Sequence, residues 1–324
     1  MKELPLPEIR IADRIRRALD QRAPVVALES TVIAHGLPHP LNLETALLCE
    51  QAVSTRAATP ATIGIVDGIP TIGLSDDQIG RFATGYSPAG GRIEKVGLNN
   101  LGTVMLKRSW GATTVASSLR LSQFAGIKVF STGGIGGVHR GAAETLDISA
   151  DLTALGDTQV ICVCAGAKAI LDLPKTLEYL ETFGVPVIGY GTEEFPAFYS
   201  CSSGLSVDVR VETAAEAAEV ADYHWRTGGR TGVLVCVPVP RESEIPASSI
   251  APALDEAMAK ATELGVRGKA VTPFLLAELE KLTGGKTVET NRALLVNNSG
   301  VAASIAVSLS RPKLGSIQAL NSLV

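Results

Sequence analysis

Short apolar runs that alternate with helical stretches most constrain the fold of this 324-residue chain. Each run is almost continuously apolar and is separated from the next by residues with helical spacing. A strand that is apolar on both sides must be covered on both faces, which is typical of a parallel sheet between layers of helices. The pattern predicts an α/β protein with three α/β/α layers around a central, mostly parallel sheet, forming a single domain over residues 1–324.

The expected strands cover residues 24–31, 61–68, 71–75, 112–118, 127–132, 160–166, 185–190, 209–213 and 231–239. The expected helices cover residues 8–22, 42–53, 76–84, 117–125, 142–156, 168–182, 214–228, 249–264, 273–284 and 290–310.

Composition excludes several classes of function. The net charge is −4 and no run of Lys and Arg stands out, which argues against a nucleic-acid surface but not against a small phosphorylated ligand. The N-terminus has no apolar stretch of the secretory type, and no apolar run reaches about 18 residues, so we expect no membrane span. Five cysteines without a repeating spacing favour a reducing, cytoplasmic setting.

A glycine-rich loop, STGGIGGVHRG at residues 131–141, follows one of the expected strands. Ligands gather at the carboxyl ends of parallel strands, and glycines let backbone N–H groups approach a phosphate. Thr132, His139 and Arg140 would add donors. The loop does not fit the dinucleotide fingerprint, because His139 stands where the third glycine is needed. The interpretation is a phosphate site, with a simple turn as the alternative.

An acidic cluster, DISAD, follows the loop and contains Asp147 and Asp151. On one helix these two residues would share a face, because they are four apart. Asp147 is a candidate ligand for a hard divalent cation whose remaining ligands are waters. The alternative is an N-terminal helix cap, which Asp and Ser commonly provide.

Two further polar residues stand in apolar surroundings. Lys168 follows CAGA at an expected strand-to-helix junction, where desolvation and the helix dipole would disfavour the ammonium form. A lysine amine of this kind suits imine chemistry with a sugar aldehyde. Glu29 ends the strand PVVALEST, so it is either a buried hydrogen-bonded anchor or a proton donor or acceptor with a raised pKa.

Several blocks of the chain together resemble the pseudouridine-5′-phosphate glycosidase, or indigoidine synthase A-like, family. They include ALESTVIAHGLPHPLNLETA, GIKVFSTGGIGGVHRG, DISADL, VCAGAKAILDLPKTLEYLETFGVPVIGY and TPFLLAELEKLTGG, and they extend over the core at roughly residues 25–310. The resemblance implies an α/β/α fold, a homotrimer and one Mn²⁺ ion per subunit. It also implies reversible cleavage of the C–C bond between ribose 5-phosphate and uracil.

The resemblance assigns roles residue by residue. Lys168 would be the nucleophile that forms an imine with C1′, Glu29 the proton donor and Asp147 the metal ligand. The residues that would contact the substrate are Lys95, Thr132 and His139 at the phosphate, Val115 and the run Ser149, Ala150 and Asp151 along the site, and Asn291 at the base.

The chain departs from its relatives at Gly97–Asn100, where they often carry charged residues, and at Ser200–Ser203. These departures leave a second function open, in which ribose 5-phosphate is joined to an aromatic acceptor other than uracil, as in an alnumycin-type C-glycosynthase. A third hypothesis is a non-catalytic protein that senses or binds ribose phosphate, in which ligand binding would not depend on Lys168.

Overall fold

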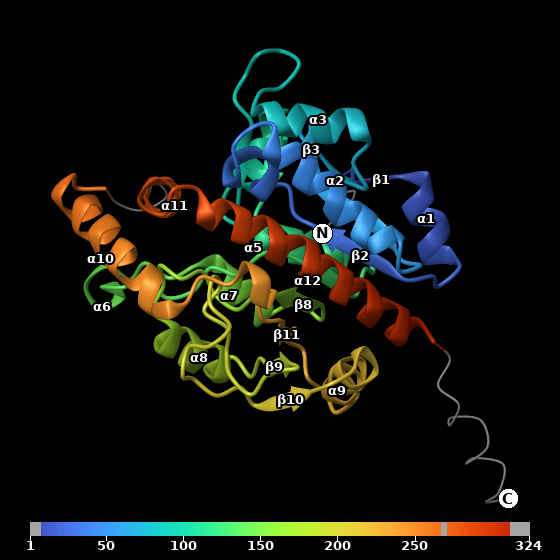
Figure 1. The fold of residues 1–324 in the computed structure, drawn as a ribbon. Helices are drawn as coiled ribbons and strands as arrows, with labels where there is room; N and C mark the ends of the chain where they lie inside the picture. The colour runs from blue at the N-terminus through green and yellow to red at the C-terminus, as the bar shows by residue number, and fades with distance from the viewer. Residues whose placement is uncertain (1–7, 267–270, 312–324) are drawn as a thin grey trace, which may run out of the picture.

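A computed structural model describes residues 8–266 and 271–311 of the chain. Eleven strands form one sheet at the centre of the molecule (Figure 1). They are β1 (Arg10–Ile11), β2 (Val25–Leu28), β3 (Thr59–Val66), β4 (Ile69–Ile72), β5 (Glu94–Val96), β6 (Gly111–Thr113), β7 (Val129–Ser131), β8 (Ile161–Cys164), β9 (Val187–Tyr190), β10 (Val209–Val211) and β11 (Val233–Cys236).

The sheet runs in the order β1-β4-β3-β2-β7-β8-β11-β9-β10, with β6 paired to β3 and β5 paired to β6. All pairs are parallel except β3 with β4 and β3 with β6. The prediction of a mostly parallel sheet is therefore confirmed. Three parallel neighbours at the centre, β2, β7 and β8, end level with one another, since Leu28 pairs with Ser131 and Ser131 with Val163.

Helices cover both faces of the sheet, as the buried strands require. They are α1 (Asp13–Asp20), α2 (Leu41–Ser54), α3 (Asp76–Thr84), α4 (Leu101–Leu106), α5 (Val115–Ala125), α6 (Ala142–Thr145), α7 (Ala150–Leu155), α8 (Leu173–Thr182), α9 (Ala214–Arg226), α10 (Ala247–Glu263), α11 (Val271–Leu282) and α12 (Lys286–Ser310), with a π-helical turn η1 (Val32–Gly36) and a 3₁₀ turn η2 (Arg241–Ser243).

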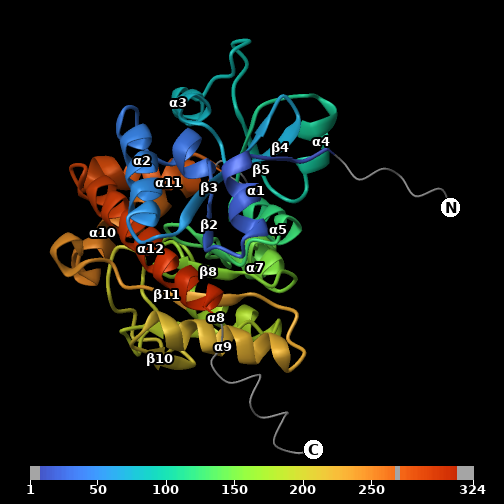
Figure 2. The same ribbon diagram turned by 90° about the vertical axis from the view of Figure 1, so that its right-hand side faces the viewer.

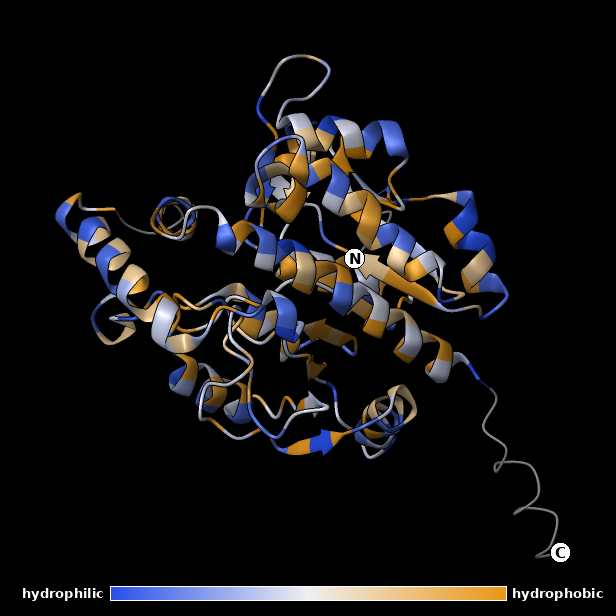
Figure 3. Ribbon diagram, viewed as in Figure 1, coloured by the Kyte–Doolittle hydropathy of each residue, from blue (hydrophilic) through white to orange (hydrophobic). Residues whose placement is uncertain are grey.

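The two helical layers differ in which helices they contain. Figure 2 shows α2 and α12 on one side of β2 and β8, and α5 and α7 on the other. Helix α12 also packs against α9 and against β2, β7 and β8. In Figure 3, β2 and β8 are hydrophobic along their length, whereas the outer helices mix hydrophobic and hydrophilic residues. Burial of both faces of the central strands thus builds the three predicted layers.

Helix α12 is long and apolar enough, by length and composition, to cross a membrane. Half of the apolar window that meets this test is buried inside the protein. Its buried positions contact the sheet and α2, which is the behaviour of a core helix. Polar residues such as Asn291 and Asn298 interrupt the helix, so the sequence contains no continuous apolar run of about 18 residues here.

Some of the expected elements differ in their bounds for identifiable reasons. The helix expected at 8–22 is a short strand, β1, followed by α1. The helix expected at 142–156 is divided into α6 and α7, because Leu146 adopts a left-handed backbone with φ of 54°. The helix expected at 168–182 begins only at Leu173, where Asp172 caps it and a proline occupies its first turn.

These differences correct two expectations about the site. Asp147 precedes α7, so Asp147 and Asp151 do not lie on one helix; Ser149 caps that helix by accepting a hydrogen bond from the Asp151 N–H. Lys168 lies in a turn before α8 and not at the helix N-terminus. The segments β5, α4 and η1 have no counterpart among the expected elements.

Gly166 provides a test of how the loop after β8 is built. It has a φ of +79°, and an added Cβ would lie 2.1 Å from the Pro196 carbonyl oxygen. We expect Gly166→Ala to destabilise the protein by roughly 3 kcal/mol or more, because strain and backbone overlap add. Gly126 has the same φ but nothing near its Cβ, so Gly126→Ala should cost only about 1 kcal/mol. Equal denaturant midpoints for the two variants would contradict this account.

Candidate active site

The carboxyl ends of β2, β7 and β8 carry three of the predicted site residues. Glu29 follows β2 directly, Thr132 follows β7 directly, and Lys168 lies four residues beyond the end of β8. Because these strands are adjacent, parallel and level, the three side chains meet at one edge of the sheet. The Thr132 hydroxyl donates a short hydrogen bond to a carboxylate oxygen of Glu29.

Backbone hydrogen bonds extend the pairing of β7 with β8 beyond both strands. The Thr132 N–H donates to the Val163 carbonyl at 3.0 Å, and the Ala165 N–H donates to the Gly133 carbonyl at 2.8 Å. The Ile135 N–H then donates to Gly166 at 3.0 Å, and the Lys168 N–H returns to Ile135 at 3.1 Å. The glycine-rich loop and the Lys168 loop are therefore held together as one unit.

Four glycines of the loop, Gly133, Gly134, Gly136 and Gly137, lie very close to neighbouring groups. A Cβ on Gly134 would be 2.5 Å from the Phe198 ring, and one on Gly133 would be 3.1 Å from Leu294 of α12. The Phe198 backbone itself is left-handed, with φ of 64°, and its N–H donates to the Ala165 carbonyl at 3.1 Å. The loop is thus closely packed against Phe198 and α12.

A cavity opens between these strand ends, η1 and the C-terminal helices. Five of the predicted site residues line it, namely Glu29, Lys95, Thr132, Lys168 and Asn291. The other residues that line it are Thr31, Val32, His35, Gly36, Gly133, Gly134, Phe198 and Leu276. The five predicted residues place one carboxyl group, two amines, a hydroxyl and an amide around a single space.

The electrostatics of Glu29 suit a proton donor. Burial raises the pKa of Glu29, and the charge of Asp151 raises it further. Lys168, the Thr132 hydrogen bond and Lys95 oppose this effect without reversing it. A carboxyl group with a raised pKa remains protonated closer to neutral pH than an exposed one.

His139 and Asp147 form a second group beside the cavity. The His139 N–H donates to the Asp147 carbonyl at 3.0 Å, and the flanking residues Val138 and Ile148 pair as an antiparallel bridge. Burial lowers the pKa of His139; the Asp147 charge opposes this, while Lys168 and Lys95 act with it. His139, predicted to bind the phosphate, and Asp147, predicted to bind the metal, therefore lie near each other and near Lys168.

Asp151 has a structural part in the site. Its two carboxylate oxygens accept hydrogen bonds from the Ala116 N–H at 2.9 Å and the Gly136 N–H at 2.8 Å. These bonds join the start of α5 to the glycine-rich loop, and Asp151 is only 6% exposed. Val115 and Asp151 are buried, Ser149 is half-buried and Ala150 is exposed; none of the four lines the cavity.

Arg140 and the serines near residue 200 also lie outside the cavity. Arg140 pairs with Asp255 of α10 at 3.5 Å. Ser200 donates to the Ile245 carbonyl at 2.6 Å, and Ser203 donates to the Phe195 carbonyl. Asn100 closes the turn after Lys95 by accepting from the Gly97 N–H at 2.9 Å. The departures at Gly97–Asn100 and Ser200–Ser203 thus shape local turns.

The side chains available as metal ligands limit which metal ion the site could hold. Within residues 8–266 and 271–311, no group of three or more His, Cys, Asp and Glu side chains is arranged to hold a metal ion. A cation at Asp147 would rest on one half-buried carboxylate, with waters as its other ligands. This arrangement fits a largely hydrated, hard divalent ion and does not fit zinc, which needs several protein ligands.

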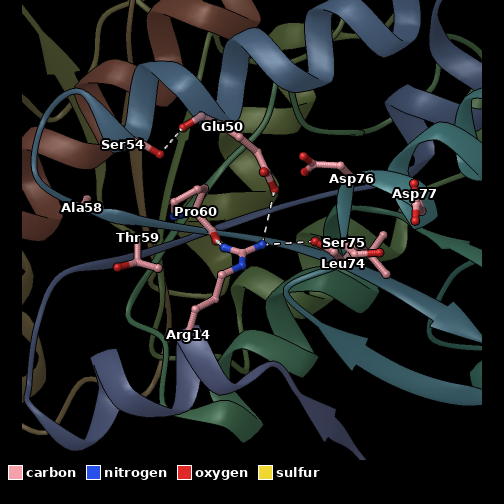
Figure 4. Close-up of a pocket in the computed structure, with 10 residues that line it drawn as sticks. All are labelled: Arg14, Glu50, Ser54, Ala58, Thr59, Pro60, Leu74, Ser75, Asp76 and Asp77. Atoms are coloured by element: carbon pink, nitrogen blue, oxygen red, sulfur yellow. Dashed lines mark hydrogen bonds and ion pairs between the residues drawn. The ribbon is translucent and has the colours of Figure 1, made fainter.

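A separate surface depression lies between α1, α2 and the start of α3 (Figure 4). Its Arg14 donates to the Pro60 and Leu74 carbonyls and lies 3.9 Å from the Glu50 carboxylate. Glu50 accepts a further hydrogen bond from the Thr62 hydroxyl at 2.6 Å. These polar groups satisfy one another and tie α1 to the sheet, so we interpret this depression as structural.

Several residues that line the cavity have no role in the sequence-based assignment, among them His35, Phe198 and Leu276. His35 stands in η1, in the segment that follows β2 and Glu29, and its Nε2 lies 3.1 Å from the Ile93 carbonyl. A short polar loop after a buried strand was a usable signal for His35. Leu276 and Phe198 come from distant segments, and only the tertiary fold brings them to the cavity.

Glu29 should lower the stability of the protein at neutral and higher pH. A carboxyl group whose pKa is raised in the folded state does not lower the free energy of unfolding while it is protonated in both the folded and the unfolded state. The cost grows as pH rises from the ordinary pKa and is complete above the raised one. We expect Glu29→Gln to unfold at a higher temperature than the wild type at about pH 8, with no difference near pH 3. Thermal unfolding at both pH values measures this, and a gain that is independent of pH would contradict it.

Comparison with known proteins gives a consistent result. The family model for indigoidine synthase A like protein matches residues 14–308. A protein of Caldanaerobacter subterraneus subsp. tengcongensis named pseudouridine-5′-phosphate glycosidase is 50% identical over 303 residues, which cover 94% of this chain and 97% of that protein.

Two solved structures are similar over most of both chains. The prealnumycin C-glycosynthase AlnA, in complex with ribulose 5-phosphate, has a TM-score of 0.86 at 39% identity and covers 94% of this chain and 98% of its own. An indigoidine synthase A-like protein of Thermotoga maritima has a TM-score of 0.84 at 36% identity, with 94% and 97% covered. With its cavity at the ends of β2, β7 and β8, this chain belongs to the indigoidine synthase A-like family.

Proposed function

We propose that this protein reversibly cleaves the C–C glycosidic bond of pseudouridine 5′-phosphate, giving ribose 5-phosphate and uracil. The observation that carries the proposal is the single cavity in which Glu29, Lys168, Lys95, Thr132 and Asn291 meet. Relatives with about half of their residues in common are named for this activity. The sugar phosphate bound by AlnA supports the substrate class.

The chemistry explains why a lysine and a carboxyl group are needed. A C-glycoside has no leaving oxygen that an acid can protonate, so the usual scheme with two carboxylates does not apply. A lysine amine can form a covalent bond to C1′ and then accept the charge that C–C cleavage leaves there. The carboxyl group supplies the proton that the departing carbon of uracil needs.

The steps balance in atoms and protons. The Lys168 amine bonds to C1′, the C1′–O4′ bond breaks, and O4′ takes a proton. Glu29 then protonates C5 of uracil, the C1′–C5 bond breaks, and the nitrogen lone pair forms the C1′ imine. Water adds to C1′, returns a proton to Glu29 and releases the aldehyde of ribose 5-phosphate from Lys168. One water is consumed in each turnover, and the reverse sequence forms the C-glycoside.

The remaining residues would hold the substrate. Lys95, Thr132 and His139 would bind the phosphate, and Asn291 would face the base. Asp147 would hold a hydrated Mn²⁺, which neutralises negative charge when it is bound. Asp151 would support the site through its hydrogen bonds to the start of α5, where Val115 lies, and to the glycine-rich loop. A homotrimer with one Mn²⁺ per subunit is the remaining part of the proposal and rests on the family resemblance. The proposed cytoplasmic location rests on the five cysteines without a repeating spacing.

A second candidate function is the joining of ribose 5-phosphate to an aromatic acceptor other than uracil. The similarity to AlnA, a C-glycosynthase, is the observation that favours it. The departures at Gly97–Asn100 and Ser200–Ser203 do not add to it, because none of these residues lines the cavity. Asn100, Ser200 and Ser203 hydrogen-bond to backbone groups instead. Both functions use the same covalent step on Lys168.

We expect the purified protein with Mn²⁺ to consume pseudouridine 5′-phosphate and release one uracil for each ribose 5-phosphate. Lys168→Ala should lower turnover by at least about 10³-fold, since the covalent route depends on its amine. Borohydride added with ribose 5-phosphate should reduce the imine and leave a stable adduct on the Lys168 peptide, read by mass spectrometry.

Lys175→Ala is the matched control, because Lys175 is an exposed lysine on α8 that pairs with Asp172. It should keep near wild-type turnover and the adduct. An adduct on Lys168 with an aromatic acceptor consumed and no uracil released would favour the second function. Sugar-phosphate binding that is unchanged in Lys168→Ala, with no adduct in the wild type, would leave only a sensor.

A further inference from the structure

Helix α12 carries an asparagine that no part of the proposed mechanism uses. Asn298 lies two helical turns after Asn291 on the same helix and is completely buried, with 0% exposure. Its Nδ2 donates to the Thr132 carbonyl at 2.9 Å and to the Gly133 carbonyl at 3.3 Å. Its Oδ1 is buried and has no donor among the described residues.

The orientation of this amide is determined by its neighbours. Two carbonyl oxygens can only accept hydrogen bonds, so the NH₂ group must face them. The side chain therefore leaves its own acceptor unsatisfied, which is costly for a buried polar group. The two donated bonds offset this cost and hold the backbone of the loop at Thr132 and Gly133.

The two carbonyls lie where the chain leaves the sheet. The Thr132 N–H still pairs with β8 at the Val163 carbonyl, and the Gly133 carbonyl accepts from the Ala165 N–H. The Thr132 carbonyl points from the sheet toward α12, where it accepts a hydrogen bond from the Asn298 side chain. The backbone of Thr132 is thus held from both sides, and its hydroxyl is directed at the Glu29 carboxylate.

We propose that Asn298 is a positioning residue for Glu29, acting through Thr132. The inference rests on the proposed function, in which Glu29 transfers the proton. Asn298 touches neither the substrate space nor Glu29; it fixes the peptide that carries the Thr132 hydroxyl. Leu295, before Asn298 on α12, and Ser299, directly after it, lie near the same strand end. Neither donates a hydrogen bond to these two carbonyls, and the Ser299 hydroxyl donates to the Leu295 carbonyl instead.

The test measures the titration of Glu29 in Asn298→Leu, in which a side chain of similar size lacks the amide donor. Glu29 in ¹³C-glutamate-labelled protein is followed by NMR and assigned with Glu29→Gln. Because the Thr132 hydrogen bond lowers the pKa of Glu29, its loss should move the titration to higher pH. The other charges that act on Glu29, those of Lys168, Asp151 and Lys95, stay unchanged. Turnover should fall about tenfold, the effect of one lost hydrogen bond.

Three further variants complete the design. Thr132→Val should shift the titration in the same direction, and the double variant with Asn298→Leu should shift it no further, because both changes remove one interaction. Asn298→Ala also removes the amide donor but introduces a smaller side chain, so it serves as the test if Asn298→Leu does not fold. Asn297→Leu, at the half-buried neighbouring position on α12, is the matched control and should leave the titration unchanged.

The outcomes separate this inference from the proposed function, since the titration needs no substrate. A Glu29 titration at the wild-type pH in the folded Asn298 variants would overturn the inference, whatever the turnover. A shifted titration with unchanged turnover would support the positioning role and count instead against Glu29 as the proton donor.

Discussion

The active site depends on the pairing of β7 with β8 beyond the ends of both strands. Four backbone hydrogen bonds from Thr132 to Lys168 join the glycine-rich loop to the loop after β8. Such backbone hydrogen bonds are normal between paired strands, but here they join two loops that carry the candidate catalytic side chains. The glycines are needed because Phe198 and α12 approach this paired segment very closely. Lys168, Thr132 and, through its hydrogen bond, Glu29 take their places from this one unit.

Buried charge gives the site its chemical character. Glu29 lies among apolar walls, with Lys168 and Lys95 near enough to lower its pKa and Asp151 near enough to raise it. Asp151 is itself buried, but its charge is satisfied by two backbone N–H groups. One carboxylate is therefore fixed in place by hydrogen bonds, whereas the other has a raised pKa and can exchange its proton. Two acids with different environments can fill these two different roles within one small space.

Much of this site could be predicted from the sequence, for specific reasons. Glu29 and Thr132 follow apolar strands directly, so their place at the edge of a parallel sheet followed from the strand pattern. The part played by Asp151 could not be predicted, because its partners at Ala116 and Gly136 are backbone groups of distant segments. The bounds of α7 and α8 depended on Leu146 and on the cap at Asp172, which override the helical spacing around them. The cavity wall formed by Phe198 and Leu276 exists only after the C-terminal helices pack on the sheet.

The most direct test of this account is a crystal structure of the protein with ribose 5-phosphate bound. We expect the sugar in the cavity at the ends of β2, β7 and β8, with C1 bonded to or in contact with the Lys168 amine. We also expect the phosphate beside Lys95, Thr132 and His139. A sugar phosphate bound in the depression between Arg14 and Glu50, or in the cavity with C1 turned away from Lys168, would contradict this account.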